Sequence, residues 1–184
     1  HRRVGADCVC HQNGSPSRRR ARRTRSGVNG TERVVHVPPG EPLVRTLRES
    51  LGFTSVRETC GMGICGTCTV LVDGRVASSC ILLTVQAHGK AITTADGLRE
   101  PSGQLSEVQR AFLRASAYQC SFCIPAMTLT VRAALDDPDV GRDRESIREY
   151  LAGNLCRCGT YPHIMTAVTD LLATAQKAED SGGE

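Results

Sequence analysis

The sequence contains no tryptophan, and phenylalanine and tyrosine together supply only six of its 184 residues. Any hydrophobic core must therefore be mainly aliphatic. The start is polar and rich in arginine, without the apolar segment of a secretory signal peptide, and no run of about 18 apolar residues follows. We therefore expect a cytoplasmic protein without a membrane span.

Cysteine, in contrast, is abundant, with ten residues. Thiols stay reduced in proteins that are not exported, so this number favours metal or redox chemistry over a framework of disulfides. Eight of the ten fall into two sets. The other two, Cys8 and Cys10, precede His11 and could bind a metal, but they lack a second pair of ligands nearby.

The net charge of +4 is distributed unevenly along the chain. Residues 1–25 hold eight arginines and one acidic residue, whereas the remainder holds 15 basic and 18 acidic residues. A like-charge block with little to bury predicts a disordered arm, which we place at residues 1–26. Such an arm could contact nucleic acid or an acidic partner. We interpret it as a solvated tail and expect no nucleic-acid partner.

The first cysteine set has the spacing C-x4-C-x2-C-x11-C and comprises Cys60, Cys65, Cys68 and Cys80. The C-x4-C-x2-C order is typical of plant-type [2Fe–2S] proteins. Glycines between these cysteines allow backbone angles that a Cβ forbids, and they let amide groups approach cluster sulfurs. These glycines are Gly61, Gly63 and Gly66.

Residues 27–96 have the pattern of a compact α+β domain around this set. The Asn29-Gly30 and Asp73-Gly74 pairs are typical of tight hairpin turns. Leucines spaced four residues apart predict a short helix that ends at Gly52. The expected elements are strands at 32–37, 69–72, 75–77 and 92–94, and a helix at 43–51.

After an expected linker at 97–103, residues 104–177 show helical spacing, followed by a tail at 178–184. Four helices with short connections predict a small helical bundle. Pro125 and Pro162 suit first turns of helices, and Asp143 suits an N-cap. The expected helices cover residues 105–115, 125–135, 145–151 and 162–172.

The second cysteine set is split between two connections of this bundle. Cys120 and Cys123 lie between its first two helices, and Cys156 and Cys158 lie between its last two. An antiparallel bundle brings both connections to one end, where helix N-termini favour a negatively charged cluster. Zinc is the alternative, because four-cysteine zinc sites are common, although the C-x-C pair is short for tetrahedral zinc.

The two sets together resemble the iron–sulfur subunit of the molybdenum hydroxylases, the family of xanthine dehydrogenase, aldehyde oxidoreductase and carbon monoxide dehydrogenase. The resemblance covers about residues 27–176 and includes all eight cysteines in order. Its motifs are the C-x4-C-x2-C-x11-C segment, Gln119-Cys120-x-x-Cys123-x-Pro125, and Gly153-Asn154-Leu155-Cys156-Arg157-Cys158.

The resemblance implies a β-grasp ferredoxin-like domain followed by a four-helix-bundle domain, each holding one [2Fe–2S] cluster. Cys60, Cys65, Cys68 and Cys80 would bind the first cluster, and Cys120, Cys123, Cys156 and Cys158 the second. Gln119 and Cys158 would contact the molybdopterin of a large partner subunit. Single electrons would pass through both clusters to FAD on a medium subunit, or to a cytochrome. This chain would perform no substrate chemistry itself.

Three positions depart from the family pattern. Ser121 and Ala126 stand where members usually carry glycine, and Gly159-Thr160 stands where many read Thr-Gly. The last change resembles a branch that uses a cytochrome as acceptor, whereas other segments resemble the FAD-linked branch. Two other functions stay open from the residues alone: an independent ferredoxin-like carrier, and a zinc-binding module that contacts nucleic acid through the basic arm.

Overall fold

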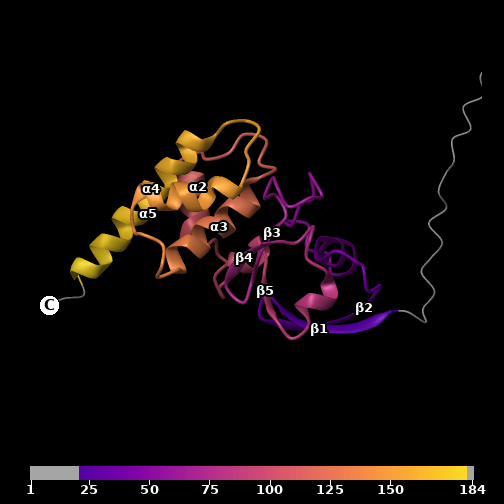
Figure 1. Ribbon diagram of the computed structural model, residues 1–184. Helices are drawn as coiled ribbons and strands as arrows, with labels where there is room; N and C mark the ends of the chain where they lie inside the picture. Colours follow the sequence, from indigo (N-terminus) through magenta and orange to yellow (C-terminus); the bar gives the residue numbers. More distant parts are fainter. Residues whose placement is uncertain (1–20, 182–184) are drawn as a thin grey trace, which may run out of the picture.

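The computed structural model describes residues 21–181, which form a mixed β-sheet followed by a group of helices (Figure 1). The helices α2 to α5 lie together on one side of the molecule, and the sheet lies on the other. This is the α+β class that the sequence predicts. None of the helices within residues 21–181 is long and apolar enough to cross a membrane.

The sheet has five strands in the order β2-β1-β5-β3-β4. Strands β1 and β5 pair in parallel, and every other neighbouring pair is antiparallel. The strands are β1 (Arg22–Val28), β2 (Thr31–Val37), β3 (Thr69–Val72), β4 (Arg75–Ser78) and β5 (Ala91–Thr93).

The predicted boundary of the arm at residue 26 is wrong, because β1 already begins at Arg22. Thr24, Ser26 and Val28 are buried, whereas Arg23 and Arg25 between them are exposed. This two-residue alternation is that of a half-buried strand. The strand was not recognised in the sequence because the arginines occupy its outward-facing positions. Residues 1–20 of the expected arm, with Cys8 and Cys10, lie outside the described residues.

Both predicted hairpin turns are confirmed. Asn29 and Gly30 join β1 to β2 with φ of 51° and 76°, and Asp73 and Gly74 join β3 to β4 with φ of 51° and 82°. Two successive positive φ angles define the type I′ turn, whose twist matches that of paired strands. The β3–β4 hairpin thereby places Cys68 and Cys80 close to its open end.

The predicted helix after β2 forms as α1 (Leu43–Arg45), continues as a π-helical turn at Thr46–Ser50, and ends at Gly52 with φ of +77°. Leu43, Val44 and Leu47 are buried against residues of the sheet. No aromatic side chain is among the fully buried members of this core, which is aliphatic as expected. Cys68 and Cys80 belong to the same core.

The helical part begins after a 3₁₀ turn at Ala95–Leu98. Its elements are α2 (Glu107–Arg114), α3 (Ile124–Asp136), α4 (Arg144–Tyr150) and α5 (Tyr161–Ser181). Pro125 lies in the first turn of α3, and Asp143 caps α4 by accepting from the amides of Glu145 and Ser146, as predicted. Cys123 and Cys156 are part of the buried core that these helices share.

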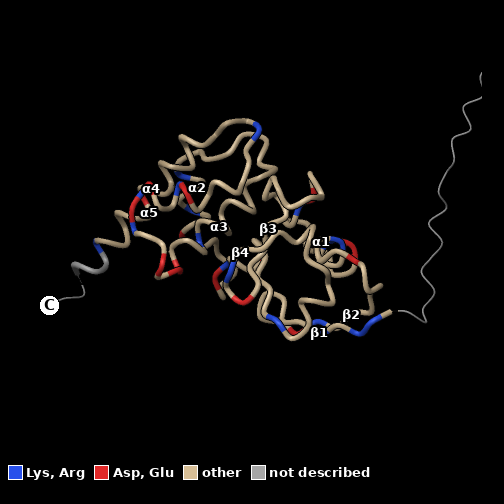
Figure 2. Tube along the Cα trace, in the orientation of Figure 1, with Lys and Arg blue, Asp and Glu red and all other residues tan. Residues whose placement is uncertain are grey.

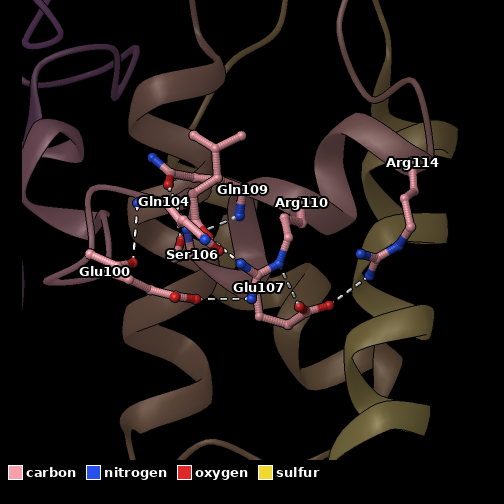
Figure 3. A network of polar contacts seen from close by, with 9 residues as sticks. Glu100, Gln104, Ser106, Glu107, Gln109, Arg110 and Arg114 are labelled. Carbon is pink, nitrogen blue, oxygen red and sulfur yellow. Dashed lines mark hydrogen bonds and ion pairs between the residues drawn. The ribbon is translucent and has the colours of Figure 1, made fainter.

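A polar network anchors the start of α2 (Figure 3). Ser106 and Gln109 form a capping box, in which each side chain bonds the other residue's backbone amide. Glu107 accepts from Arg110 and Arg114, and Arg110 also pairs with Glu100 of the preceding connection. These contacts fix the connection between the sheet and the helices to α2.

The two parts pack directly on each other. Leu71 of β3 is buried with Leu129 and Ala133 of α3 in a hydrophobic cluster that spans both parts. Helix α3 therefore lies against the strand that follows the first cysteine loop. Because α3 also begins directly after Cys123, the packing of β3 on α3 positions one cysteine set relative to the other.

Candidate metal centres

The first cysteine set lies in the loop at residues 60–68, which leads into β3, and at Cys80, just after β4. Cys60 and Cys65 are half-buried, whereas Cys68 and Cys80 are buried. Cys60 and Cys65 lie close enough for the Cys65 thiol to influence the pKa of Cys60, and the Cys68 thiol likewise influences the pKa of Cys80. The four predicted ligands are thus brought together as two pairs.

Donors from the loop point at these sulfurs. The amide of Gly63 donates to Cys80 Sγ at 3.3 Å, the amide of Cys65 donates to Cys60 Sγ at 3.4 Å, and Thr67 Oγ1 lies 3.2 Å from Cys65 Sγ. The amide of Cys65, followed by those of Met62 and Ile64, lowers the pKa of the Cys60 thiol to about 6. Burial raises the pKa of the Cys80 thiol to about 11. The loop is therefore built to stabilise negative charge on its exposed side.

Two glycines in this loop have positive φ angles and close neighbours that disfavour any larger residue. Gly66 has φ of +69°, and a Cβ there would lie 2.3 Å from Gly153 O. Gly63 has φ of +77°, and a Cβ there would lie 2.8 Å from Ile81 Cδ1. The predicted role of the glycines is confirmed at both positions, and at Gly66 the reason includes the close approach of another loop.

The second set also converges at one end of the helices, as the antiparallel arrangement predicts. Cys120 and Cys158 are exposed, and Cys123 and Cys156 are buried. The Cys158 thiol influences the pKa of Cys120, and the Cys156 thiol influences the pKa of Cys123, so the members of each pair lie near each other. A cavity of about 360 Å³ is lined by three of these cysteines and by Cys65 of the first loop. Both cysteine sets thus border one space.

As in the first set, one thiol has a lowered pKa and a more deeply buried thiol has a raised pKa. The amide of Phe122 lowers the pKa of the Cys120 thiol, while burial raises the pKa of the Cys123 thiol to about 12. At Cys156, burial raises the thiol pKa, but the amide of Thr160 and other donors outweigh this effect and bring the pKa below its ordinary value. The side-chain hydroxyl of Thr160 is buried and finds no hydrogen-bond partner among residues 21–181.

Ser121, one of the departures from the family pattern, adopts φ of +62° between Cys120 and Cys123. Glycine enters this left-handed region freely, whereas serine does so at a cost. The loop therefore keeps the conformation that a glycine would favour. Ala126, the second departure, is buried in the first turn of α3.

The two cysteine loops are docked on each other, which the sequence did not predict. Leu155 directly precedes Cys156, and its amide donates to Cys65 O at 2.9 Å. The buried Asn154 side chain donates to Gly66 O at 2.9 Å and accepts from Thr130 of α3 at 3.0 Å. The signal in the sequence that could have indicated this bridge is the asparagine two residues before Cys156, since such a side chain needs hydrogen-bond partners if it is buried.

The arrangement fits two-iron clusters. All eight described cysteines are free, so no disulfide joins them. Within residues 21–181, no three or more histidine, cysteine or acidic side chains gather around one point as a single ion requires. A [2Fe–2S] cluster instead takes two ligands at each iron, which suits thiols arranged as two pairs. The amides of Gly63 and Cys65 in the first loop and of Thr160 beside Cys156 supply donors to the sulfurs.

The surface around the second set is apolar and faces outward. Gln119 is exposed next to Cys120, and Cys158 is exposed as well. Large apolar side chains around them are 40–50% exposed. These side chains are Tyr118, Phe122, Leu155 and Tyr161.

Two family models match the chain in adjacent segments. Residues 26–93 match the 2Fe-2S iron-sulfur cluster binding domain, and residues 94–169 match the [2Fe-2S] binding domain. The first match contains Cys60, Cys65, Cys68 and Cys80, and the second contains the other four.

Relatives of known name cover most of the chain. It is 43% identical to the xanthine dehydrogenase iron-sulfur-binding subunit of Escherichia coli over 147 aligned positions, and the match covers 78% of this chain and 89% of the relative. It is 41% identical to 6-hydroxypseudooxynicotine dehydrogenase complex subunit beta of Paenarthrobacter nicotinovorans, with 78% and 89% covered.

Solved structures agree with these relatives. A chain of quinoline 2-oxidoreductase from Pseudomonas putida superposes with a TM-score of 0.79 and 38% identity, covering 86% of this chain and 98% of that one. The aldehyde oxidoreductase of Desulfovibrio desulfuricans gives a TM-score of 0.77 and 36% identity, covering 84% of this chain but 17% of that one. In that enzyme, the equivalent segment is a small part of a much longer chain.

Proposed function

The chain belongs to the family of [2Fe–2S] iron–sulfur subunits of molybdenum hydroxylases, and from this premise we propose that it carries electrons between two sites on partner subunits. The observation that supports this most strongly is the pair of cysteine sets, which border one cavity and meet through the Leu155 N–H to Cys65 O hydrogen bond. One set would receive an electron while the other passes it on.

Each part of the fold would hold one cluster. We propose a β-grasp ferredoxin-like part with Cys60, Cys65, Cys68 and Cys80 as ligands, and a four-helix part with Cys120, Cys123, Cys156 and Cys158 as ligands. When bound, the clusters would supply reversible one-electron oxidation and reduction. The protein holds the ligands in place and aims amide donors at them, which influences the reduction potentials.

The second set would face a large molybdopterin-binding subunit. Gln119 and Cys158 are both exposed there, within an apolar surface that suits a protein partner. By resemblance, these two residues would contact the pterin. The first set would face the acceptor, FAD on a medium subunit or a cytochrome.

The test is to purify the tagged full-length chain from its own host and measure molybdenum and flavin that elute with it. Molybdenum present with the clusters supports the proposal, and flavin in the same complex identifies FAD as the acceptor. Clusters without molybdenum or any stable partner would instead favour an independent ferredoxin-like carrier. Gln119→Ala provides a comparison, because it should weaken electron transfer from the molybdenum subunit without removing either cluster.

A further inference from the structure

Arg57 contacts both cysteine loops, although it belongs to neither cysteine set. Its backbone amide donates to Thr67 O of the first loop at 3.4 Å. Its side-chain Nη1 donates to Ser121 O of the second loop at 2.6 Å, and its guanidinium lies 5.0 Å from the ring centroid of Phe122. One residue therefore joins the loop that holds Cys65 and Cys68 to the loop that holds Cys120 and Cys123.

The carbonyl that Arg57 binds belongs to the strained residue of the second loop. Ser121 has φ of +62°, and a residue other than glycine keeps such a conformation only where its surroundings determine it. The hydrogen bond to Ser121 O and the stacking on Phe122 hold the two residues between the ligands Cys120 and Cys123. The guanidinium therefore limits how far these ligands can move.

Arg57 also supplies a positive charge where the loops have almost none. Residues 60–68 and 119–123 contain no charged side chain, and residues 153–158 contain only Arg157 (Figure 2). Arg157 is exposed, where solvent screens its charge, whereas Arg57 is half-buried against the loop. A guanidinium stays protonated throughout the physiological pH range. Because reduction adds negative charge to a cluster, a fixed cation beside it favours the reduced form.

We propose that Arg57 is a positioning residue for the second cluster, fixing the loop at residues 120–123 and raising the reduction potential of the cluster that this loop binds. This inference rests on the proposed function, since it requires that both sets bind clusters. On this account, the Arg57 side chain contributes to the difference in reduction potential between the first and the second cluster.

The experiment compares the parent chain with Arg57→Gln, Arg57→Lys and Arg132→Gln, each purified with its clusters and titrated with reductant while EPR follows each cluster. In Arg57→Gln, the ratio of reduced to oxidised second cluster at a fixed potential should fall about tenfold, or about 59 mV for a one-electron couple. Arg57→Lys keeps the charge and should shift this ratio less. The first cluster should change little in either variant.

Arg132→Gln is the control for charge. It removes one positive charge from the exposed side of α3, where Arg132 pairs with Asp136, about 12 Å along the helix from its start. Both potentials should stay at the parent values. An unchanged second-cluster potential in Arg57→Gln, or equal shifts of both clusters, would overturn the proposal.

Failure of Arg57→Gln to assemble a cluster also tests the proposal. If Arg57→Gln assembles the first cluster but not the second, the positioning role is supported, because only the loop that Arg57 holds has failed. Loss of both clusters together would contradict a role specific to the second loop.

A second measurement separates this inference from the proposed function. Hydrogen exchange of the peptide at residues 118–126 should be faster in Arg57→Gln than in the parent and in Arg132→Gln, whatever the metal content. The metal content of the parent tests the proposed function. Equal exchange rates in all three proteins would overturn the role of Arg57 even if both clusters were present.

Discussion

At the scale of single residues, the eight candidate ligands differ in how deeply they are buried. Each set contains a buried thiol whose pKa is raised by burial and a less buried thiol whose pKa is lowered by backbone amides, as Cys80 and Cys60 show in the first set. The spacing of the cysteines was sufficient to predict all eight candidates, because short spacings are local features. It could not predict the contact of Arg57 with Ser121 or that of Asn154 with Gly66, which join residues 64 and 88 positions apart.

The ligand assignment predicts that the two signals can be removed separately. Cys65→Ser should abolish the EPR signal of the first cluster, and Cys158→Ser should abolish or alter that of the second, each leaving the other signal in place. The reason is that the sets belong to separate parts of the fold. Both signals persisting with normal electron transfer in Cys158→Ser would show that this assignment is wrong.

Gly66 should be far less tolerant of substitution than Gly74, although both have positive φ. Gly66→Ala adds a Cβ against Gly153 O, whereas the Cβ added by Gly74→Ala has no neighbour within 4 Å among residues 21–181. We expect the free energy of unfolding, measured with urea, to fall by about 1 kcal/mol for Gly74→Ala and about 3 kcal/mol or more for Gly66→Ala. Equal losses would mean that the contact between the loops does not stabilise the fold.

At the scale of elements, short sequence motifs correctly predicted the turns and helix ends that neighbouring residues determine. The two hairpin turns, the first turn of α3 at Pro125 and the cap of α4 at Asp143 all form as expected. The start of β1 at Arg22 was missed because its exposed side carries arginines and its buried side carries Thr24 and Ser26 rather than large apolar residues. Ser26 is buried because its hydroxyl donates to Ala87 O, a contact 61 residues away.

The cap of α4 offers a test with a defined pH dependence. Hydrogen bonds from the hydroxyl and amide of Ser146, and from the amide of Glu145, hold the pKa of Asp143 below its ordinary value. The cap is therefore complete above about pH 3.9, the pKa of an unfolded aspartate, and is lost only as pH falls through the lower folded pKa.

Asp143→Ala should accordingly lower the Tm by about 2–4 °C, and by the same amount at pH 5.5 as at pH 8. Asp143→Asn should lower it less, because an asparagine oxygen also accepts from these amides. Thermal unfolding followed by circular dichroism measures both variants. A penalty that shrinks between pH 8 and 5.5 would contradict the depressed pKa.

At the scale of the whole molecule, direct contacts hold the sheet and the helical part together. Leu71 packs on Leu129 and Ala133, Asn154 bridges Gly66 and Thr130, and Arg57 binds Ser121. The sequence predicted each part but not their docking, because no local pattern encodes which surfaces meet. The docking brings Cys65 of the first set and three cysteines of the second set to the lining of one cavity, as the proposed electron path requires.

The central claim is that this one chain binds two [2Fe–2S] clusters. The most direct test is chemical analysis of iron, acid-labile sulfide and zinc in the purified chain, together with EPR of the reduced protein. We predict about four irons and about four sulfides per chain, with two distinct reduced-cluster signals. Zinc without sulfide, or two irons and a single signal, would contradict the claim.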